Sequence, residues 1–292
     1  SSYVAGSPQY YYEIIPDPIN PDRVYSMDTF LQVTEDAGKN WRRLSYASKH
    51  VDDHALWINP KDTDHLLAGC DGGIYESFDR GENWRFFPNL PITQFYRVAI
   101  DNDEPFYNVY GGTQDNNTIG GPSRTTFGHG ASNREWFFTL GGDGFKPAVD
   151  PTNPNIVYCQ WQYGNLNRYD KTSGEKLDIQ PQPELGEILN WNWNSPLLIS
   201  PHNHERLYYC CQKVFVSEDM GHSWTKISGE LNSGVDRNKL EIMDRVWGVD
   251  AVAKNNSTSV YGSIISFNES SVQEGLLMAG TDDGLIHVRQ PG

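Results

Sequence analysis

The segment Ser77-Phe-Asp79-Arg-Gly81-Glu-Asn-Trp84 decides the fold, because its pattern Ser/Thr-x-Asp-x-Gly-x-x-Trp occurs three times in the chain. The other copies are Thr34-Glu-Asp36-Ala-Gly38-Lys-Asn-Trp41 and Ser217-Glu-Asp219-Met-Gly221-His-Ser-Trp224. Hydroxyl and carboxylate side chains at these positions suit a tight turn in which they bond backbone amides, and Gly supplies a positive φ. The Trp is expected to return on the next strand and pin the turn to the layer beneath it. Three copies indicate a repeated structural unit, in which the turn has a structural role.

A second recurring feature is a short apolar segment that ends in a turn-forming residue. These segments end at Asp17, Asn59, Asp101, Asp150, Ser200 and Ser266. A Pro/Asn-rich turn follows most clearly at 17–21 and 150–154, and another apolar segment comes after it. The ends lie 42 to 66 residues apart. Several short strands in a unit of this length are typical of β-propeller blades.

The sequence therefore predicts an all-β chain, a β-propeller of four-stranded antiparallel blades with about six blade units. We expect the blades to start near residues 15, 57, 99, 148, 198 and 264, within one propeller domain or propeller segment that spans 1–292. The sixth unit has no recognisable fourth strand. Either residues 1–6 supply that strand, or the chain is part of a larger propeller, which we favour. The one helix expected lies around 240–246.

Composition limits the class of partner. The chain has 292 residues, a formal net charge of −15 and no basic cluster, which disfavours nucleic acid. No apolar run approaches the roughly 18 residues that cross a bilayer, and no signal peptide remains, as is expected both of a mature exported protein and of a soluble cytoplasmic one. The 16 Tyr, 9 Trp and Asn-rich loops favour an exported, carbohydrate-associated protein. Four cysteines are too few for a disulfide scaffold and are expected to be small packing residues: Cys70, Cys159, Cys210 and Cys211.

Strand direction predicts which loops can form a site. Because antiparallel strands reverse, the Pro/Asn turns and the Asp-type turns should share one face of the blades. The loops between second and third strands, with the connections between blades, should share the other, which we call the loop-rich face. Polar and aromatic segments gather on that face, so a ligand site is expected there. They are 50–54, 69–73, 111–117, 141–145, 161–165, 190–194 and 280–284.

Carboxylates on the loop-rich face are the candidates for catalysis. Asp115 and Asp143 are the first choice, and the alternatives are Asp52, Asp71 and Asp282. A retaining glycoside hydrolase needs two carboxylates about 5 Å apart, and an inverting one needs roughly 6.5–9.5 Å. The sequence does not say which two acids converge.

Amides and indoles on the same face are the candidates for ligand binding. Gln114, Asn116 and Asn117 could bind sugar hydroxyls or a hard cation such as calcium, but irregular turns demand the same residue types. Trp161 lies on a loop of this face. Trp191 and Trp193 are two apart, so in a strand they would face the same way and could stack on sugar rings. The alternative is that they pack an inner strand.

One short segment has the spacing of a metal site. His50, Asp52 and His54 alternate, so in a strand their side chains would share a face and could ligate a metal. Such residues more often hydrogen-bond to loop backbone. Calcium or another divalent cation is the only cofactor that the sequence suggests.

The triplicate turn resembles the Asp-box, or BNR repeat, of sialidases, xyloglucan-type glycoside hydrolases and Vps10/sortilin propellers. The longer phrases Asp52-Asp-His-Ala-Leu-Trp-Ile-Asn-Pro60 and Gly111-Gly-Thr-Gln-Asp-Asn116 are similar to bacterial exported proteins of the Vps10/sortilin-like, glycosyl-hydrolase-related group. The resemblance implies export, a multi-bladed propeller and a longer intact protein. Sialidase chemistry is disfavoured, because the N-terminal arginine phrase of that family is missing.

Two functions compete on these residues. The first is a non-catalytic binding or assembly module for glycan or protein ligands on the loop-rich face, with other subunits of a surface assembly as further partners. The alternative is a glycoside hydrolase that acts through two Asp or Glu carboxylates. We expect the first, because it explains the many amide and aromatic side chains without requiring a poised acid pair.

Overall fold

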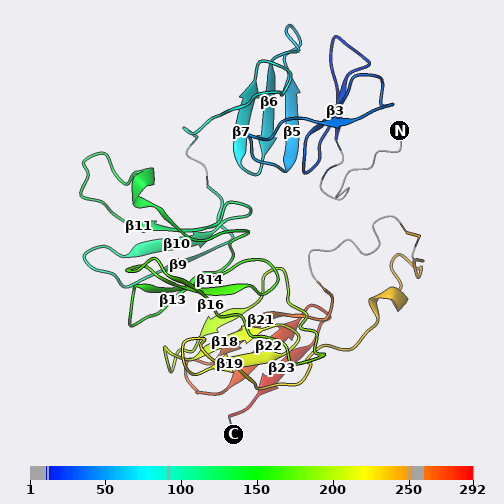
Figure 1. Ribbon diagram of the computed structural model, residues 1–292. Helices are drawn as coiled ribbons and strands as arrows, with labels where there is room; N and C mark the ends of the chain where they lie inside the picture. The colour runs from blue at the N-terminus through cyan, green and yellow to red at the C-terminus, as the bar shows by residue number, and fades with distance from the viewer. Residues whose placement is uncertain (1–10, 12, 91–92, 249, 252–259, 292) are drawn as a thin grey trace. The chain divides into compact units, whose positions relative to one another are not determined.

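The computed structural model describes residues 11, 13–90, 93–248, 250–251 and 260–291. The chain divides into two compact units, unit 1 (residues 1–93) and unit 2 (residues 94–292), which Figure 1 shows in blue to cyan and in green to red. The sequence predicts no boundary at this position. In the part of the chain that the structure describes, no helix is long and apolar enough to cross a membrane.

Unit 1 contains two antiparallel four-stranded sheets, each with its strands in chain order. The first is β1 (Ile14–Pro16), β2 (Val24–Ser26), β3 (Gln32–Thr34) and β4 (Arg42–Arg43), and the second is β5 (Asp53–Ile58), β6 (Leu66–Cys70), β7 (Gly73–Ser77) and β8 (Arg85–Phe86). The core fills the space between the two sheets. Tyr25 and Val33 of the first sheet pack with Leu66 and with Trp84, which precedes β8.

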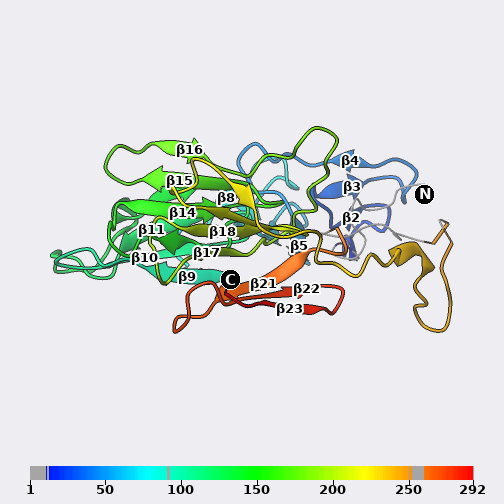
Figure 2. The same cartoon turned by 90° about the horizontal axis from the view of Figure 1, so that it is seen from below.

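Unit 2 contains four antiparallel sheets, again in chain order. They are β9 (Arg97–Ile100), β10 (Asn108–Gly112), β11 (Thr118–Pro122) and β12 (Phe137–Leu140); β13 (Ala148–Val149), β14 (Ile156–Gln160), β15 (Leu166–Asp170) and β16 (Lys176–Asp178); β17 (Leu197–Ile199), β18 (Leu207–Cys210), β19 (Val214–Ser217) and β20 (Thr225–Lys226); and β21 (Ile264–Glu269), β22 (Leu277–Thr281) and β23 (Ile286–Arg289). First strands of successive sheets touch: β13 contacts β9 and β17, and β17 contacts β21. Figure 2 labels three of these strands, β9, β17 and β21. Buried side chains such as Tyr158, Leu166 and Tyr209 fill the space between neighbouring sheets.

The architecture is all-β, of the β-propeller class with four-stranded antiparallel blades, as the repeat predicts. The expected starts fall in β1, β5, β9, β13, β17 and β21. The last sheet has three strands in the described residues, and the expected contribution of residues 1–6 lies outside them. All four cysteines are free, and Cys159, Cys210 and Cys211 are buried.

The helix expected around 240–246 is not there. A single short 3-10 turn covers Arg237–Lys239, and an antiparallel bridge joins Glu241 to Val246. This segment buries no side chain over 241–246, so it lacks the packed apolar face from which most helices in proteins derive their stability.

The three Ser/Thr-x-Asp-x-Gly-x-x-Trp turns have the hydrogen bonds that the sequence predicts. In the copy before β20, Ser217 Oγ accepts the N–H of Gly221 (2.8 Å) and donates to Asp219 Oδ1 (2.7 Å), which also accepts the N–H of Ser223 (2.8 Å). The same bonds form from Thr34 and Ser77. The central glycines have φ between 84° and 89°, where a Cβ is disfavoured. The Ser223 hydroxyl, which donates to Asp219 Oδ2 (2.6 Å), and then the Ser223 N–H lower the pKa of Asp219 to about 2.

Backbone hydrogen bonds confirm which loops share an end of each blade. The Asp-type turns bond to the Pro/Asn turns of the same sheet, through Ala37 N–H to Asp22 O (2.9 Å) and Met220 N–H to Glu205 O (2.9 Å). At the opposite end, Gly144 N–H of a blade connection donates to Thr113 O (3.0 Å) in the loop after β10. The predicted loop-rich face is therefore a structural feature of the blades.

Candidate functional site

Four segments of unit 2 form what we call the loop cluster: 114–117 after β10, 141–145 after β12, 161–165 after β14 and 190–194 before β17. Hydrogen bonds and ring contacts link them across two blades and the connection to a third. Asn117 N–H donates to Gly142 O (3.0 Å), and Asp143 N–H donates to Gln162 Oε1 (3.1 Å). Trp193 contacts Phe145 and Tyr163, with ring centroids 6.2 and 5.2 Å apart.

The acid pair Asp115 and Asp143 lies inside this cluster. Asp143 is 2% exposed, and its Oδ1 accepts the N–H of Asp115 at 2.6 Å. Burial raises the pKa of Asp143 to about 6, and a hydrogen bond between the two carboxyl groups adds to the effect. Two carboxyl groups in contact disfavour each other's ionisation, which acts in the same direction as burial on the pKa of Asp143.

This arrangement differs from that of a glycoside hydrolase. Carboxyl groups that are hydrogen-bonded to each other lie closer than the roughly 5 Å of a retaining pair, and they leave no room for a sugar between them. Asp143 is also enclosed by its own loops. The geometry matches an internal clamp, in which Asp143 holds the 114–117 turn against the 161–165 loop.

The residues of the 114–117 segment divide into those that form the turn and one that is exposed. Asp115 and Asn117 have φ of 58° and 72°, a backbone conformation that Asp and Asn tolerate. The Asn116 side chain donates to Gln114 O (3.0 Å), inside the same turn. Gln114 is exposed, and its Oε1 accepts the Tyr96 hydroxyl (2.8 Å). Gln114 is the amide that a ligand reaches most directly.

The two tryptophans of 190–194 have different environments, which corrects the expectation that they face the same way. Trp191 is buried and packs on Tyr209 and Phe215, so it is a core residue and not a ligand platform. No strand forms here, so the two-residue alternation of a strand does not apply. The Trp193 ring instead makes an edge-on contact with the Tyr163 ring.

The exposed aromatic surface of the cluster consists of Trp161 (38% exposed) and Tyr163 (46% exposed), with Trp193 edge-on to Tyr163 at 87°. Tyr163 is not among the residues that the sequence singles out. Its sequence signal is the following Gly164: both residues have positive φ, so the turn projects the ring outward.

In unit 1, the predicted set His50, Asp52 and His54 does not converge. Strand β5 begins only at Asp53, and its register is irregular between Asp53 and Ala55, so regular alternation fails. His50 Nδ1 lies 2.9 Å from Val51 O, as in the hydrogen-bonding alternative. The ligand atoms of this set do not all lie within 4.8 Å of one another.

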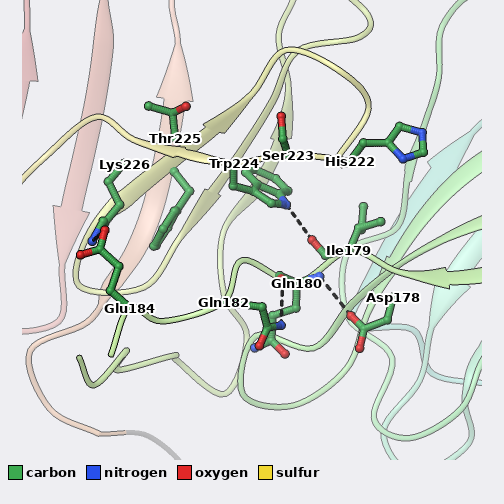
Figure 3. A pocket seen from close by; sticks show the side chains of 12 residues that line it. Asp178, Ile179, Gln180, Gln182, Glu184, His222, Ser223, Trp224, Thr225 and Lys226 are labelled. Carbon is green, nitrogen blue, oxygen red and sulfur yellow. Dashed lines mark hydrogen bonds and ion pairs between the residues drawn. The ribbon is translucent and has the colours of Figure 1, made fainter. Parts of the chain in front are cut away.

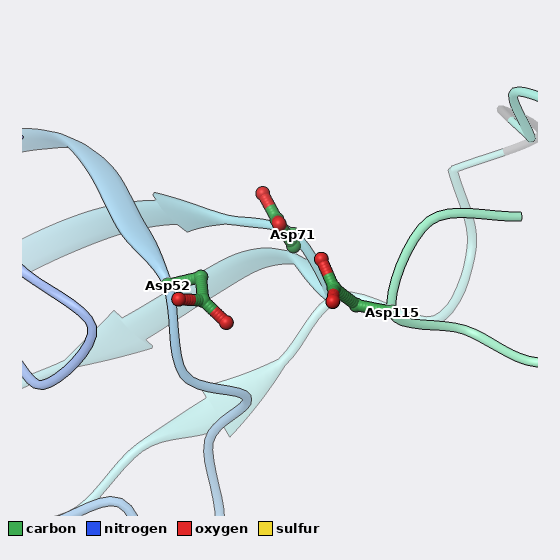
Figure 4. A group of neighbouring side chains, drawn as sticks. All are labelled: Asp52, Asp71 and Asp115. Atoms are coloured by element: carbon green, nitrogen blue, oxygen red, sulfur yellow. The ribbon is translucent and has the colours of Figure 1, made fainter. Parts of the chain in front are cut away.

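His54 and Asp52 have partners within unit 1. His54 Nε2 lies 3.0 Å from Asp71 Oδ1, and its ring stacks on Tyr11. The Tyr11 hydroxyl donates to Asp52, and carboxylate oxygens of Asp52 and Asp71 lie within 4.8 Å of each other. Figure 4 draws these two acids at neighbouring strand ends, together with Asp115, which belongs to unit 2.

The remaining acids of the loop-rich face serve the fold. Asp282 accepts the N–H groups of Gly262 (2.8 Å) and Ser263 (2.9 Å), so this alternative catalytic candidate caps a loop. Asp53 is buried and pairs with the equally buried Lys49 at 2.6 Å. Burial raises the pKa of Asp53, although Lys49 acts in the opposite direction.

Comparison with known proteins finds solved structures of low identity and low TM-score. No family model and no curated protein matches the chain. Among solved structures, a GH74 enzyme of Niastella koreensis is 15% identical with a TM-score of 0.33, over 75% of this chain and 38% of its own. The extracellular domain of a candidate one-component system from B. thetaiotaomicron is 14% identical with a TM-score of 0.43, over 99% of this chain and 33% of its own. YCF48 bound to D1 peptide is 13% identical with a TM-score of 0.30, over 70% of this chain and 63% of its own. The chain thus spans less than two thirds of each of these structures.

Proposed function

We propose that this chain is a non-catalytic binding or assembly module that takes a glycan or protein ligand on the loop cluster of unit 2. The observation that carries the proposal is the exposed pair Trp161 and Tyr163, with Trp193 edge-on to Tyr163, in the same loop cluster as Gln114. Aromatic rings offer a flat apolar surface to sugar C–H faces or to apolar side chains, and an amide both donates and accepts hydrogen bonds. A surface that combines aromatic rings with an amide can bind a ligand without a catalytic group.

The alternative is a glycoside hydrolase that acts through Asp115 and Asp143. A carboxyl group with a pKa of about 6 could serve as a general acid near neutral pH. The burial of Asp143 and its contact with Asp115 argue against this role, because a general acid must reach the glycosidic oxygen. We therefore rank the hydrolase second.

We further propose that the chain belongs with the Asp-box (BNR) propellers of the Vps10/sortilin-like group, and that it is exported. The repeated hydrogen bonding of the three Asp-type turns supports the first part. Export rests on that assignment and on the aromatic, acidic composition. A calcium ion or another divalent cation stays a prediction, for which Asp52 and Asp71 offer oxygen ligands in unit 1.

The test pairs a retention assay with an activity assay on a panel of plant, algal and bacterial polysaccharides. Wild-type protein and the variants Trp161→Ala and Tyr163→Ala are passed over each immobilised polysaccharide, and reducing-end release is measured in parallel. Tyr107→Ala is the matched control, because Tyr107 is equally exposed but follows β9 at the opposite end of its blade. Urea unfolding of each variant verifies that it is folded.

We expect retention of the wild type and of Tyr107→Ala, about tenfold weaker retention of Trp161→Ala and Tyr163→Ala, and no reducing-end release. Release that disappears in Asp143→Asn would establish the hydrolase and overturn the proposal. Retention that is equal in all four proteins would remove the loop cluster as the binding site.

A further inference from the structure

A groove of about 830 Å³ lies in unit 2 beside the last Asp-type turn, and none of its lining residues belongs to the loop cluster (Figure 3). One wall is Trp224 with Ser223 and Thr225, at the start of β20. The other wall is the segment after β16, which carries Gln180 and Gln182. The volume is that of a site for a small ligand.

The indole of Trp224 is held in a fixed orientation. Its Nε1–H donates to Ile179 O at 2.7 Å, and the ring lies partly buried against the core between the β13–β16 and β17–β20 sheets. Gly221 packs so closely on Ile179 that an added Cβ would lie 2.5 Å from its Cδ1. The Asp-type turn and the preceding blade thus fix the ring before any ligand arrives, which lowers the entropy cost of binding.

One of the two equivalent tryptophans of unit 1, Trp84, is covered. Trp84 occupies the same position in its Asp-type turn and is 7% exposed. Ser48 Oγ bonds to Trp84 O (3.1 Å), and Lys49 Nζ lies over the indole, 5.6 Å from the ring centre. Leu44 packs on Gly81 there as Ile179 packs on Gly221. The motif alone therefore does not create a groove, and the segment after β16 leaves Trp224 open.

The segment after β16 is held by ion pairs at its C-terminal end. Lys226 Nζ lies 2.7 Å from Glu184 and 3.2 Å from Glu187, and Lys213 Nζ lies 2.6 Å from Glu187. These contacts lower the pKa of Glu187 to about 2, chiefly through the hydrogen bond from Lys213. The wall that carries Gln180 and Gln182 is thus tied to β20 at neutral pH.

The polar groups of the groove suit hydroxyl ligands. Gln180 Nε2 donates to Tyr163 O (3.4 Å) and Gln182 Nε2 to Gln180 O (3.0 Å), and no described donor bonds to either amide oxygen. Those oxygens, the Asp178 carboxylate and the Thr225 hydroxyl can receive or give hydrogen bonds to hydroxyl groups.

Charge and strand length narrow the ligand class further. Glu184 and Asp178 line the groove in a chain of net charge −15, which disfavours an anion. β20 has only two residues, too few to pair with an added peptide strand. An aromatic platform with neutral hydrogen-bonding groups matches the alternation of C–H faces and hydroxyls on a sugar ring.

We propose that this groove binds a neutral oligosaccharide, with Trp224 as the stacking platform and Gln182 and Thr225 as hydroxyl partners. The groove adjoins the loop cluster through the bond from Gln180 to Tyr163 O but shares no lining residue with it, so the proposal does not depend on a ligand there.

Isothermal titration with cellohexaose, mannohexaose and xylohexaose tests the proposal. The variants Gln182→Ala and Thr225→Ala each remove one hydrogen-bonding group from the groove, without removing a core contact. Gln273→Ala is the matched control, since Gln273 is an exposed glutamine of unit 2 in the turn between β21 and β22. Trp161→Ala separates this site from the loop cluster.

At least one hexaose should bind to the wild type, to Gln273→Ala and to Trp161→Ala with equal affinity. Gln182→Ala and Thr225→Ala should each weaken binding about fivefold, the effect of one lost hydrogen bond. Binding that is weakened by Trp161→Ala but not by the groove variants would overturn this inference and support the loop cluster. Absence of binding by all three hexaoses, or tighter binding of polygalacturonate than of any of them, would also overturn it.

Discussion

Replacement of Asp143 by Asn should raise the free energy of unfolding at pH 8 and change it much less at pH 4.5. Asn has nearly the same shape, so its Oδ1 can still accept the Asp115 N–H, and its Nδ2 can donate to the Asp115 carboxylate. The variant therefore removes a buried ionisation and keeps the clamp.

The magnitude follows from the pKa of Asp143, about 6 in the fold against a usual 3.8. A folded pKa above the unfolded one contributes stability that is complete below pH 3.8 and is lost as the pH rises through 6. At about 1.4 kcal/mol per tenfold change in acidity, the buried carboxylate costs at most about 3 kcal/mol at pH 8 and about 1 kcal/mol at pH 4.5. The neutral Asn side chain does not ionise, so it has no such free-energy cost at either pH.

Urea unfolding of wild type and Asp143→Asn at pH 4.5, 6 and 8 measures this difference. The stability gain of the variant should grow by about 2 kcal/mol between pH 4.5 and pH 8. Asp22→Asn is the control, because Asp22 is exposed and its side chain accepts no hydrogen bond in the described structure. A gain that is the same at all three pH values, or that falls as the pH rises, would refute the reasoning.

Two further predictions concern stability. Lys49→Met should lower the free energy of unfolding by about 3 to 5 kcal/mol, because it leaves the Asp53 carboxylate buried without its cation; a loss below about 1 kcal/mol in urea would contradict this. Gly221→Ala should lower the free energy of unfolding by at least about 1 kcal/mol more than Gly174→Ala. Both glycines have positive φ, but only at Gly221 would a Cβ lie against Ile179. Equal thermal midpoints of the two variants would show that Ile179 moves to make room for the Cβ.

The features predicted from the sequence are those that local chemistry dictates. Turn residues such as Asp79 and Gly81 specify their own hydrogen bonds and φ, and the spacing of apolar segments gives the strand starts. Antiparallel connectivity then determines which loops share an end of a blade. Each of these inferences needs only neighbouring residues and the direction of the chain.

Side-chain orientation in the loops could not be predicted in this way. The expectations for Trp191 with Trp193, and for His50 with His54, both assume the regular alternation of a strand. The first pair lies in a segment without strand, and the second flanks the irregular start of β5. In both places tertiary contacts, such as the packing of Trp191 on Tyr209, decide where the side chain points.

The groove at Trp224 gives the clearest case of this limit. Trp84 and Trp224 end the same eight-residue pattern, and both follow a glycine packed by a residue of the preceding blade. The motif fixes the position of each indole but not what lies over it. In unit 1 the four residues after Leu44 turn back, so that Lys49 reaches Trp84, whereas the segment after Ile179 runs on to its ion pairs with Lys226. Function in repeated folds of this kind is therefore to be sought in the connections between blades, where the repeat places no constraint on sequence.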